Sequence, residues 1–190
     1  MFDVQKTINE SIDIKSKLID FCLEDIIRAG KLMAKSINSG GKIIWCGNGG
    51  SAADAQHMAA ELMGGLVSHD RKPIPSIALT TDTSFITAWS NDTDFSTIFS
   101  RQIEGIGNEN DVLMSISTSG NSPNVVKAIK SAVGLKIKNI IITGKNGGEM
   151  RDLGDISICV PSNNTQRIQE SHLLIEHILC EYLESLFLNS

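Results

Sequence analysis

The residues most able to do chemistry are His57 and Glu61, four positions apart in a helical stretch. Residues at this spacing share one helix face, so the imidazole and the carboxylate can act together as acid, base or metal ligands. The corner before them, residues 47–51, is glycine-rich, which lets the backbone turn sharply and approach a ligand. We expect Ser51 to cap the helix, whose free N–H groups suit an anion. An isolated His–Glu pair is usually only a solvated pair, but its place behind a glycine corner favours a site.

A second loop of this kind spans residues 115–123, after another apolar run. Ser122 is placed to cap a helix with Pro123 in its first turn, where the missing N–H costs nothing. Further hydroxyls come from Ser117, Thr118 and Ser119. With the helix N–H groups, and without a fixed lysine, they would form a mild phosphate cradle suited to a sugar phosphate. The nucleotide-binding pattern G-x-x-x-x-G-K-[ST] is absent, and the plainer alternative is a serine-rich turn that only caps its helix.

The elements that must position these residues follow an alternating pattern. Apolar runs predict strands at residues 42–46, 75–79, 111–117, 139–143 and 155–160. Helical spacing predicts one long helix or two short ones within 2–38, and helices near 51–63, 83–90, 94–106, 122–133, 148–152 and 165–187. This order predicts a three-layer α/β fold with a doubly wound, five-stranded parallel sheet, in which ligands bind at the carboxyl ends of the strands.

Composition limits the classes of protein to consider. The chain has 190 residues, a net charge of −5 and no basic run, which argues against nucleic-acid binding. Its four cysteines form no C-x-x-C pair and are expected to be buried reduced thiols. No hydrophobic signal segment or membrane-spanning stretch is present. We expect one cytoplasmic domain over residues 1–190, with neither a nucleic acid nor a membrane as partner.

Several motifs together resemble a known family. They are CGNGGSAADAQH with Glu61 following, ALTTDTSF followed by SND at 90–92, FSRQIE, ISTSGNSPNV and RIQESHLLIEH. The chain resembles the sugar isomerase (SIS) domain family over nearly its whole length, and within it the phosphoheptose isomerases. The resemblance implies an aldose–ketose isomerase that converts sedoheptulose 7-phosphate to D-glycero-D-manno-heptose 7-phosphate through an enediol. The product would serve as a precursor of surface heptose, in lipopolysaccharide or capsule.

The resemblance also implies roles for particular residues. Substrate contacts would come from Asn48, Gly49, Gly50, Glu61, Asn91, Asp92, Ser117, Thr118, Ser119, Ser122 and Gln169. One zinc ion per subunit would be bound by His57, Glu61, Gln169 and His177, and could be lost on purification. Glu61 would act as the base and His177 as its acid partner. Spacing alone would nominate His172 as the ligand nearest Gln169, but the resemblance favours His177 and leaves His172 as a helix-face histidine.

The implied reaction is compatible with these residue types. Aldose–ketose interconversion removes a proton beside a carbonyl and returns it to the neighbouring carbon, which requires a base, a proton donor and stabilisation of an oxyanion. A divalent metal can provide that stabilisation as a Lewis acid. Two imidazoles, a carboxylate and an amide oxygen can complete a zinc site, although the amide is an uncommon ligand.

Two departures from the family pattern bear on the substrate. Gly65 stands where many members have an arginine, and Gln166 where some have an aspartate. Neither belongs to the implied zinc site, so they affect the identity of the sugar more than the reaction type. Two alternatives stay open: an isomerase for a different ketose phosphate, and a non-enzymatic SIS-domain binding protein of the type that associates with the replication initiator. The latter pattern lacks the glutamate and the last histidine, whereas this chain has both.

The spacing of Gln169 and His177 bears on assembly. They are eight residues apart, about 12 Å along a straight helix, which is too far for both to bind one zinc ion. Either the helix unwinds near residues 167–169, or a neighbouring subunit provides one ligand. The long apolar-faced terminal helices also suggest packing between chains. We therefore expect a homo-oligomer, a tetramer as the resemblance implies, with active sites at subunit interfaces.

Overall fold

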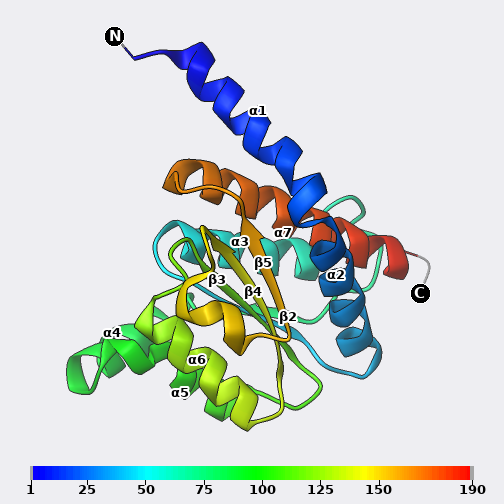
Figure 1. Ribbon diagram of the computed structural model, residues 1–190. Helices are drawn as coiled ribbons and strands as arrows, with labels where there is room; N and C mark the ends of the chain where they lie inside the picture. The colour runs from blue at the N-terminus through cyan, green and yellow to red at the C-terminus, as the bar shows by residue number, and fades with distance from the viewer. Residues whose placement is uncertain (1, 189–190) are drawn as a thin grey trace.

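A five-stranded parallel sheet forms the centre of the computed structural model, which describes residues 2–188 (Figure 1). The strands are β1 (Ile43–Cys46), β2 (Ser76–Ala78), β3 (Val112–Ser117), β4 (Lys138–Gly144) and β5 (Ile156–Val160). Their spatial order is β2-β1-β3-β4-β5. All pairs are parallel, with Ile43 aligned to both Ser76 and Val112. The chain reverses its direction of winding between β1 and β3, so the carboxyl ends of these strands meet at the topological switch point, where ligands bind in such folds.

Helices cover both faces of the sheet, as the alternating pattern predicts. They are α1 (Val4–Phe21), α2 (Leu23–Asn38), α3 (Gly50–Gly64), α4 (Thr83–Asp92), α5 (Ile98–Ile106), α6 (Pro123–Gly134) and α7 (Thr165–Phe187), with short helices η1 (Phe95–Thr97) and η2 (Gly148–Leu153). Trp45 and Met114 face a core that includes residues of α2, α3 and α7. Ile44 and Leu113 face the opposite core, which includes residues of α5 and α6. Successive strand residues therefore point to opposite faces, each covered by helices.

The N-terminal region forms two helices rather than one, with Cys22 in a non-helical conformation between them. Leu18 is the buried residue of α1, and Figure 1 shows this helix, in dark blue, projecting from the rest of the molecule. Three of the four cysteines, Cys22, Cys46 and Cys180, are buried free thiols, whereas Cys159 is half-buried. Among residues 2–188, no helix has the length and apolarity needed to cross a bilayer.

Candidate active site

The glycine corner after β1 begins α3, but not in the predicted way. Gly49 is the N-cap residue, with φ 58°, a left-handed conformation that glycine adopts without a steric penalty. The predicted cap at Ser51 is wrong, because Ser51 lies inside the first turn, is buried and follows a helix start with no side-chain cap. The first N–H groups of α3 are therefore left without a serine cap at a corner where Asn48 is half-buried and Gly49 and Gly50 are exposed.

The serine corner after β3 has converging hydroxyls. Ser122 is the N-cap residue of α6 and Pro123 opens the helix, as predicted, but the Ser122 hydroxyl does not bond to the helix backbone. It lies 3.0 Å from the Ser117 hydroxyl, which is 3.5 Å from that of Ser119 and accepts a hydrogen bond from the Gly120 N–H at 3.2 Å. Thr118 is half-buried and Ser119 is exposed. Hydroxyls at the start of a helix form a geometry suited to a phosphate.

An amide pair joins the two corners. Asn48 and Asn124 exchange two side-chain hydrogen bonds of 2.8 Å each, so the glycine corner is fastened to the first turn of α6. Asn124 is 2 % exposed. Sequence reasoning did not identify Asn124; the available signal was an asparagine followed directly by the apolar stretch Val125–Val126 of an amphipathic helix. The contact holds the predicted substrate loops of β1 and β3 side by side.

The turn after β4 supports the serine corner from its other side. The Gly144 N–H donates to the Thr118 carbonyl at 3.2 Å, and the Met150 N–H donates to the Gly120 carbonyl at 3.0 Å. Gly120 has φ +68°, and a Cβ there would overlap the carbonyl of Gly147. Backbone therefore packs directly on backbone, which restricts the serine corner to one conformation.

A second group of predicted residues meets where α3 packs against α7. His57 Nε2 lies 3.0 Å from Glu61 Oε1, and the rings of His57 and His177 are 5.0 Å apart at an interplanar angle of 79°. His177 Nδ1 lies 2.9 Å from the Leu173 carbonyl, to which it must donate, so Nε2 of His177 is left without a proton in the neutral ring. The His57 and Glu61 side chains are 44 % and 22 % exposed. This histidine cluster (His57, Glu61 and His177) is thus accessible from outside.

Two further carboxyl groups lie near the histidine cluster and were not predicted. Burial raises the pKa of Asp54, an effect that the nearby His57 and His177 partly offset. Glu176 is fully buried, and neither of its oxygens has a hydrogen-bond partner among the described residues. Burial, together with the charge of Asp54, raises its pKa to about 8. The only sequence feature that could have indicated Glu176 is its position on the buried face of α7, four residues after His172.

Gln169 does not join the histidine cluster. It lies over the start of α3, where a Cβ added to Gly50 would come within 3.3 Å of the Gln169 amide nitrogen. The predicted possibility that the helix unwinds near residues 167–169 is wrong, because α7 is continuous from Thr165. Within residues 2–188, no three His, Cys, Asp or Glu side chains are arranged to hold a metal ion. His57, Glu61 and His177 nevertheless have the ligand types that zinc takes.

The remaining residues named from the sequence lie in different places, some exposed and some buried. Asn91 and Asp92 end α4, are exposed and hydrogen-bond to each other at 2.8 Å; no described hydrogen bond connects them to either corner. His172 is fully buried rather than on a helix surface, and burial lowers its pKa to about 4. Trp45 is a fully buried core residue.

The conformation of the turn after α3 explains why position 65 is a glycine. Its φ is +111°, and a Cβ there would overlap the Ser68 carbonyl, so an arginine could not adopt this turn without strain. The turn is held by Glu184, whose carboxylate accepts hydrogen bonds from the N–H groups of Leu66, Val67 and Ser68 at 2.8–3.0 Å. These bonds help to lower the pKa of Glu184 despite its burial.

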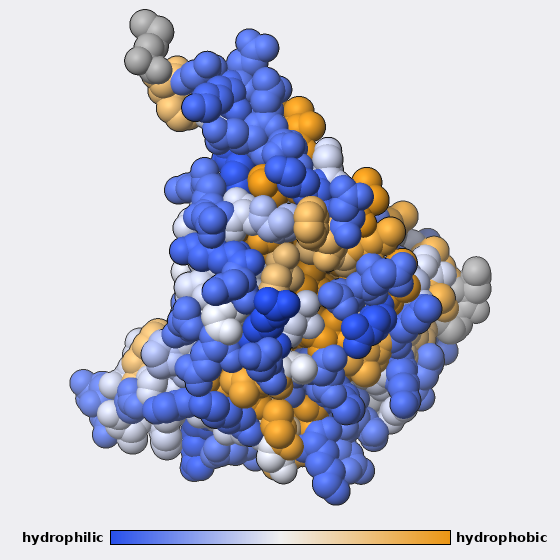
Figure 2. All heavy atoms as spheres, in the orientation of Figure 1, coloured by the Kyte–Doolittle hydropathy of each residue, from blue (hydrophilic) through white to orange (hydrophobic). Residues whose placement is uncertain are grey.

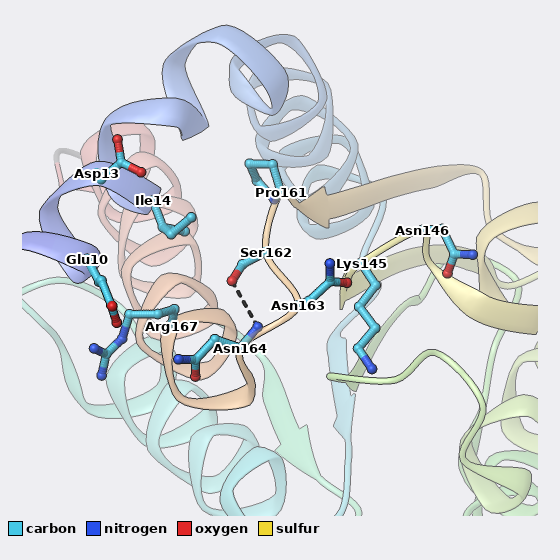
Figure 3. A pocket seen from close by; sticks show the side chains of 10 residues that line it. All are labelled: Glu10, Asp13, Ile14, Lys145, Asn146, Pro161, Ser162, Asn163, Asn164 and Arg167. Carbon is cyan, nitrogen blue, oxygen red and sulfur yellow. Dashed lines mark hydrogen bonds between the residues drawn. The ribbon is translucent and has the colours of Figure 1, made fainter. Parts of the chain in front are cut away.

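A cavity of about 760 Å³ opens beside these elements, between α1, the loops after β4 and β5, and the start of α7 (Figure 3). Its lining residues are Glu10, Asp13, Ile14, Lys145, Asn146, Pro161, Ser162, Asn163, Asn164 and Arg167. None of them is among the predicted site residues, although Lys145 directly follows the strand that supports the serine corner.

Known proteins resemble this chain in sequence and in structure. The SIS domain family matches residues 8–144. A phosphoheptose isomerase of Campylobacter jejuni is 53 % identical over 162 residues, which cover 85 % of this chain and 87 % of the relative. One from Aquifex aeolicus is 44 % identical over 183 residues, covering 96 % and 95 % of the two chains.

Solved structures agree with the sequence relatives. The phosphoheptose isomerase of Neisseria gonorrhoeae superposes with a TM-score of 0.90 at 42 % identity, covering 96 % of this chain and 97 % of that one. The enzyme of Francisella tularensis gives a TM-score of 0.92 at 38 % identity, with 96 % of each chain covered. The chain therefore belongs to the SIS domain family and, within it, to the phosphoheptose isomerases.

Proposed function

We propose that this protein converts sedoheptulose 7-phosphate to D-glycero-D-manno-heptose 7-phosphate through an enediol, as a step toward surface heptose. Membership of the phosphoheptose isomerases makes it an aldose–ketose isomerase acting on a sugar phosphate. The observation that carries the proposal is the histidine cluster, in which Glu61 and two imidazoles lie within reach of one another. A non-enzymatic binding protein would have no need of a base and an acid in this arrangement.

Each residue group has a distinct task in this reaction. Glu61 removes the proton beside the carbonyl, and His177, through Nε2 while no metal is bound there, exchanges a proton with the substrate oxygens. The serine corner, with Ser117, Thr118, Ser119 and Ser122, holds the phosphate. The glycine corner and the amide of Gln169 contact the sugar, as would Asn91 and Asp92 if the end of α4 approaches the bound substrate.

Zinc is the metal that best fits the donors of the histidine cluster. His57, Glu61 and His177 would hold it, with Gln169 of the partner subunit as a fourth ligand, because the chain's own Gln169 lies over the start of α3. When bound, the ion would act as a Lewis acid toward the carbonyl oxygen. After treatment with a chelator, the protein should take up about one zinc ion per subunit, and His57→Ala should weaken uptake at least about tenfold.

Metal content and a competing chromogenic chelator measure this uptake independently of activity. His69→Ala is the matched control, because His69 is an exposed histidine of the loop after α3. Equal zinc binding by His57→Ala and the wild type would place the metal elsewhere.

We further propose that the active site forms between subunits of a homo-oligomer, a tetramer as in the family pattern. Gly50, beside Gln169, and Glu61 are about 16 Å apart along α3, farther than the carbon chain of a seven-carbon sugar phosphate extends. The partner's serine corner would therefore face the histidine cluster. Apolar side chains are also exposed along α1 and α2; they include Val4, Ile8, Ile12, Ile19, Phe21, Leu23 and Ile27. Figure 2 shows separate orange groups among blue ones along the projecting helix α1.

Mixing two impaired variants tests the shared site. Glu61→Gln removes the base from one half and Ser119→Ala weakens the other, so refolded mixtures should regain activity in hybrids. At equal mixing, about a quarter of the sites would combine two intact halves. A mixture of Glu61→Gln and His177→Ala is the control that should stay inactive, since both lesions fall in the histidine cluster. A fully active monomer in sedimentation would contradict the proposal.

A different ketose phosphate is the second candidate substrate, and the altered turn at Gly65 favours considering it. The absence of the family arginine removes a cation from the loop that follows the helix of Glu61. An isomerase assay over ketose phosphates of different chain lengths decides between the two candidates. The highest kcat/KM for sedoheptulose 7-phosphate is the expected result.

A further inference from the structure

Lys145 adopts a backbone conformation that is unfavourable for lysine. Its φ is +53°, and it occupies the first central position of a turn closed by a 3.0 Å hydrogen bond from the Gly147 N–H to the Gly144 carbonyl. Turns with a positive φ at this position and a negative one at the next usually carry glycine there. The Lys145 N–H donates to the Ser162 carbonyl at 2.9 Å, which fixes the residue to the loop after β5. A lysine held at such a position suggests that its side chain has a function.

The positive φ of Lys136, in contrast, has an ordinary structural reason. Lys136 is the other non-glycine residue with positive φ among residues 2–188, at +62°. It follows the end of α6, and its N–H donates to the Val133 carbonyl at 3.1 Å. A left-handed residue is a common way to end a helix. Lys145 follows a strand instead, so this explanation does not apply to it.

The position of Lys145 places a cation next to the serine corner. The preceding residue, Gly144, donates to Thr118, and the turn that contains Lys145 packs on Gly120. Figure 3 shows the Lys145 side chain extending away from Glu10 and Asp13, toward the pale green ribbon that follows β3. Its ammonium group makes no hydrogen bond or ion pair within residues 2–188.

Two lysines of α6 on this side are already paired. Lys127 of α6 lies 3.2 Å from Asp94, and Lys130 lies 2.9 Å from Glu149. The serine corner itself offers hydroxyls and N–H groups but no positive charge. A dianionic phosphate held there would gain a charge-assisted hydrogen bond from a lysine in reach.

We propose that Lys145 is a substrate-binding residue that provides the positive charge of the phosphate site from the turn after β4. This inference rests on the proposed phosphate site at the serine corner. The strained turn orients the side chain. The contacts of Gly144 and Gly147 with the serine corner fix the position of the lysine relative to the hydroxyls. Lys145 would therefore select for a phosphorylated sugar without taking part in proton transfer.

Lys145→Asn tests this role, because asparagine tolerates positive φ while lacking the charge. We expect KM for sedoheptulose 7-phosphate, and the inhibition constant of inorganic phosphate, to rise about 10- to 100-fold, with little change in kcat. Lys136→Asn is the matched control, with the same substitution at a positive φ before the amino end of β4, and should leave both constants unchanged. Lys145→Arg should retain most of the affinity for phosphate. Thermal unfolding shows whether each variant is folded.

A parallel Ser119→Ala variant separates failure of this proposal from failure of the phosphate site. If Ser119→Ala weakens phosphate inhibition and Lys145→Asn does not, the role of Lys145 is overturned while the serine corner stands. If neither variant changes it, phosphate binds elsewhere and both assignments are wrong. A loss of kcat with unchanged KM, or of thermal stability alone, in Lys145→Asn would also overturn the proposal.

Discussion

The serine corner and the histidine cluster differ in how completely one chain builds them. The serine corner is held on one side by the Asn48–Asn124 amide pair and on the other by backbone contacts from the turn after β4. The histidine cluster consists of side chains on two helix surfaces, with His57 44 % exposed and Gln169 outside the cluster. The difference matches the proposed function, in which phosphate binding is organised within one chain and the catalytic half would be completed by association.

The physical reason lies in what restrains each group. Backbone hydrogen bonds and glycine contacts leave the serine corner few alternative conformations. Exposed side chains keep rotamer freedom until a metal, a substrate or another subunit orders them. Disrupting each half in turn should therefore have different consequences, and the following changes are ordered by the size of their expected effect.

Loss of the base should be the most damaging change. Glu61→Gln keeps the size of the side chain but cannot accept a proton, so kcat should fall about 10²- to 10⁴-fold. The unfolding midpoint should change little, because Glu61 is partly exposed. Activity and exchange of the substrate α-proton with solvent measure the effect. Glu181→Gln, an exposed glutamate four residues beyond His177, is the control; proton exchange at the wild-type rate in Glu61→Gln would eliminate Glu61 as the base.

Disrupting the serine corner should instead reduce stability. Gly120→Ala places a Cβ against the Gly147 carbonyl at a φ of +68°, and should lower the free energy of unfolding by roughly 1–3 kcal/mol or more. Denaturant unfolding gives the value. Gly40→Ala is the control, because Gly40 has a φ of +78° with no atom within 4 Å of an added Cβ. Equal losses in both variants would show that the backbone contact adds nothing beyond the strained φ.

The pH dependence of stability should report on His172, the buried imidazole of α7. Burial lowers its pKa from 6.5 to about 4. Between these pH values the imidazole is therefore protonated in the unfolded chain but neutral in the folded protein. Stability from this residue is present above pH 6.5 and is lost as the pH falls toward 4. The loss amounts to about 2–3 kcal/mol at pH 4.5. His172→Gln should flatten the decline in unfolding free energy between pH 7 and 4.5, whereas His69→Gln should not; an unaltered decline in His172→Gln would contradict the buried-imidazole explanation.

Much of the fold and of the site follows from local patterns. All five predicted strands are present within about one residue of their predicted bounds. The pairing of His57 with Glu61 follows from helical spacing, and Pro123 opens α6 as predicted. The predicted Ser51 cap failed because the glycines before it let α3 begin earlier, with Gly49, two residues before Ser51, as the N-cap. Local propensity therefore predicted which element forms more reliably than where it begins.

The sequence by itself determined the parallel α/β fold, the two loops at the switch point and the residue types able to catalyse an isomerisation. These properties depend on periodicity and spacing over short stretches of chain, which can be read without knowing what packs against them. Only the tertiary structure decided that His177 meets His57, that Asn124 joins the two corners, and that Gln169 lies apart. It also brought Lys145 to a cradle that the motif alone had left without a cation. Such contacts connect residues 26 to 120 positions apart, and their geometry depends on how the helices and loops pack on the sheet.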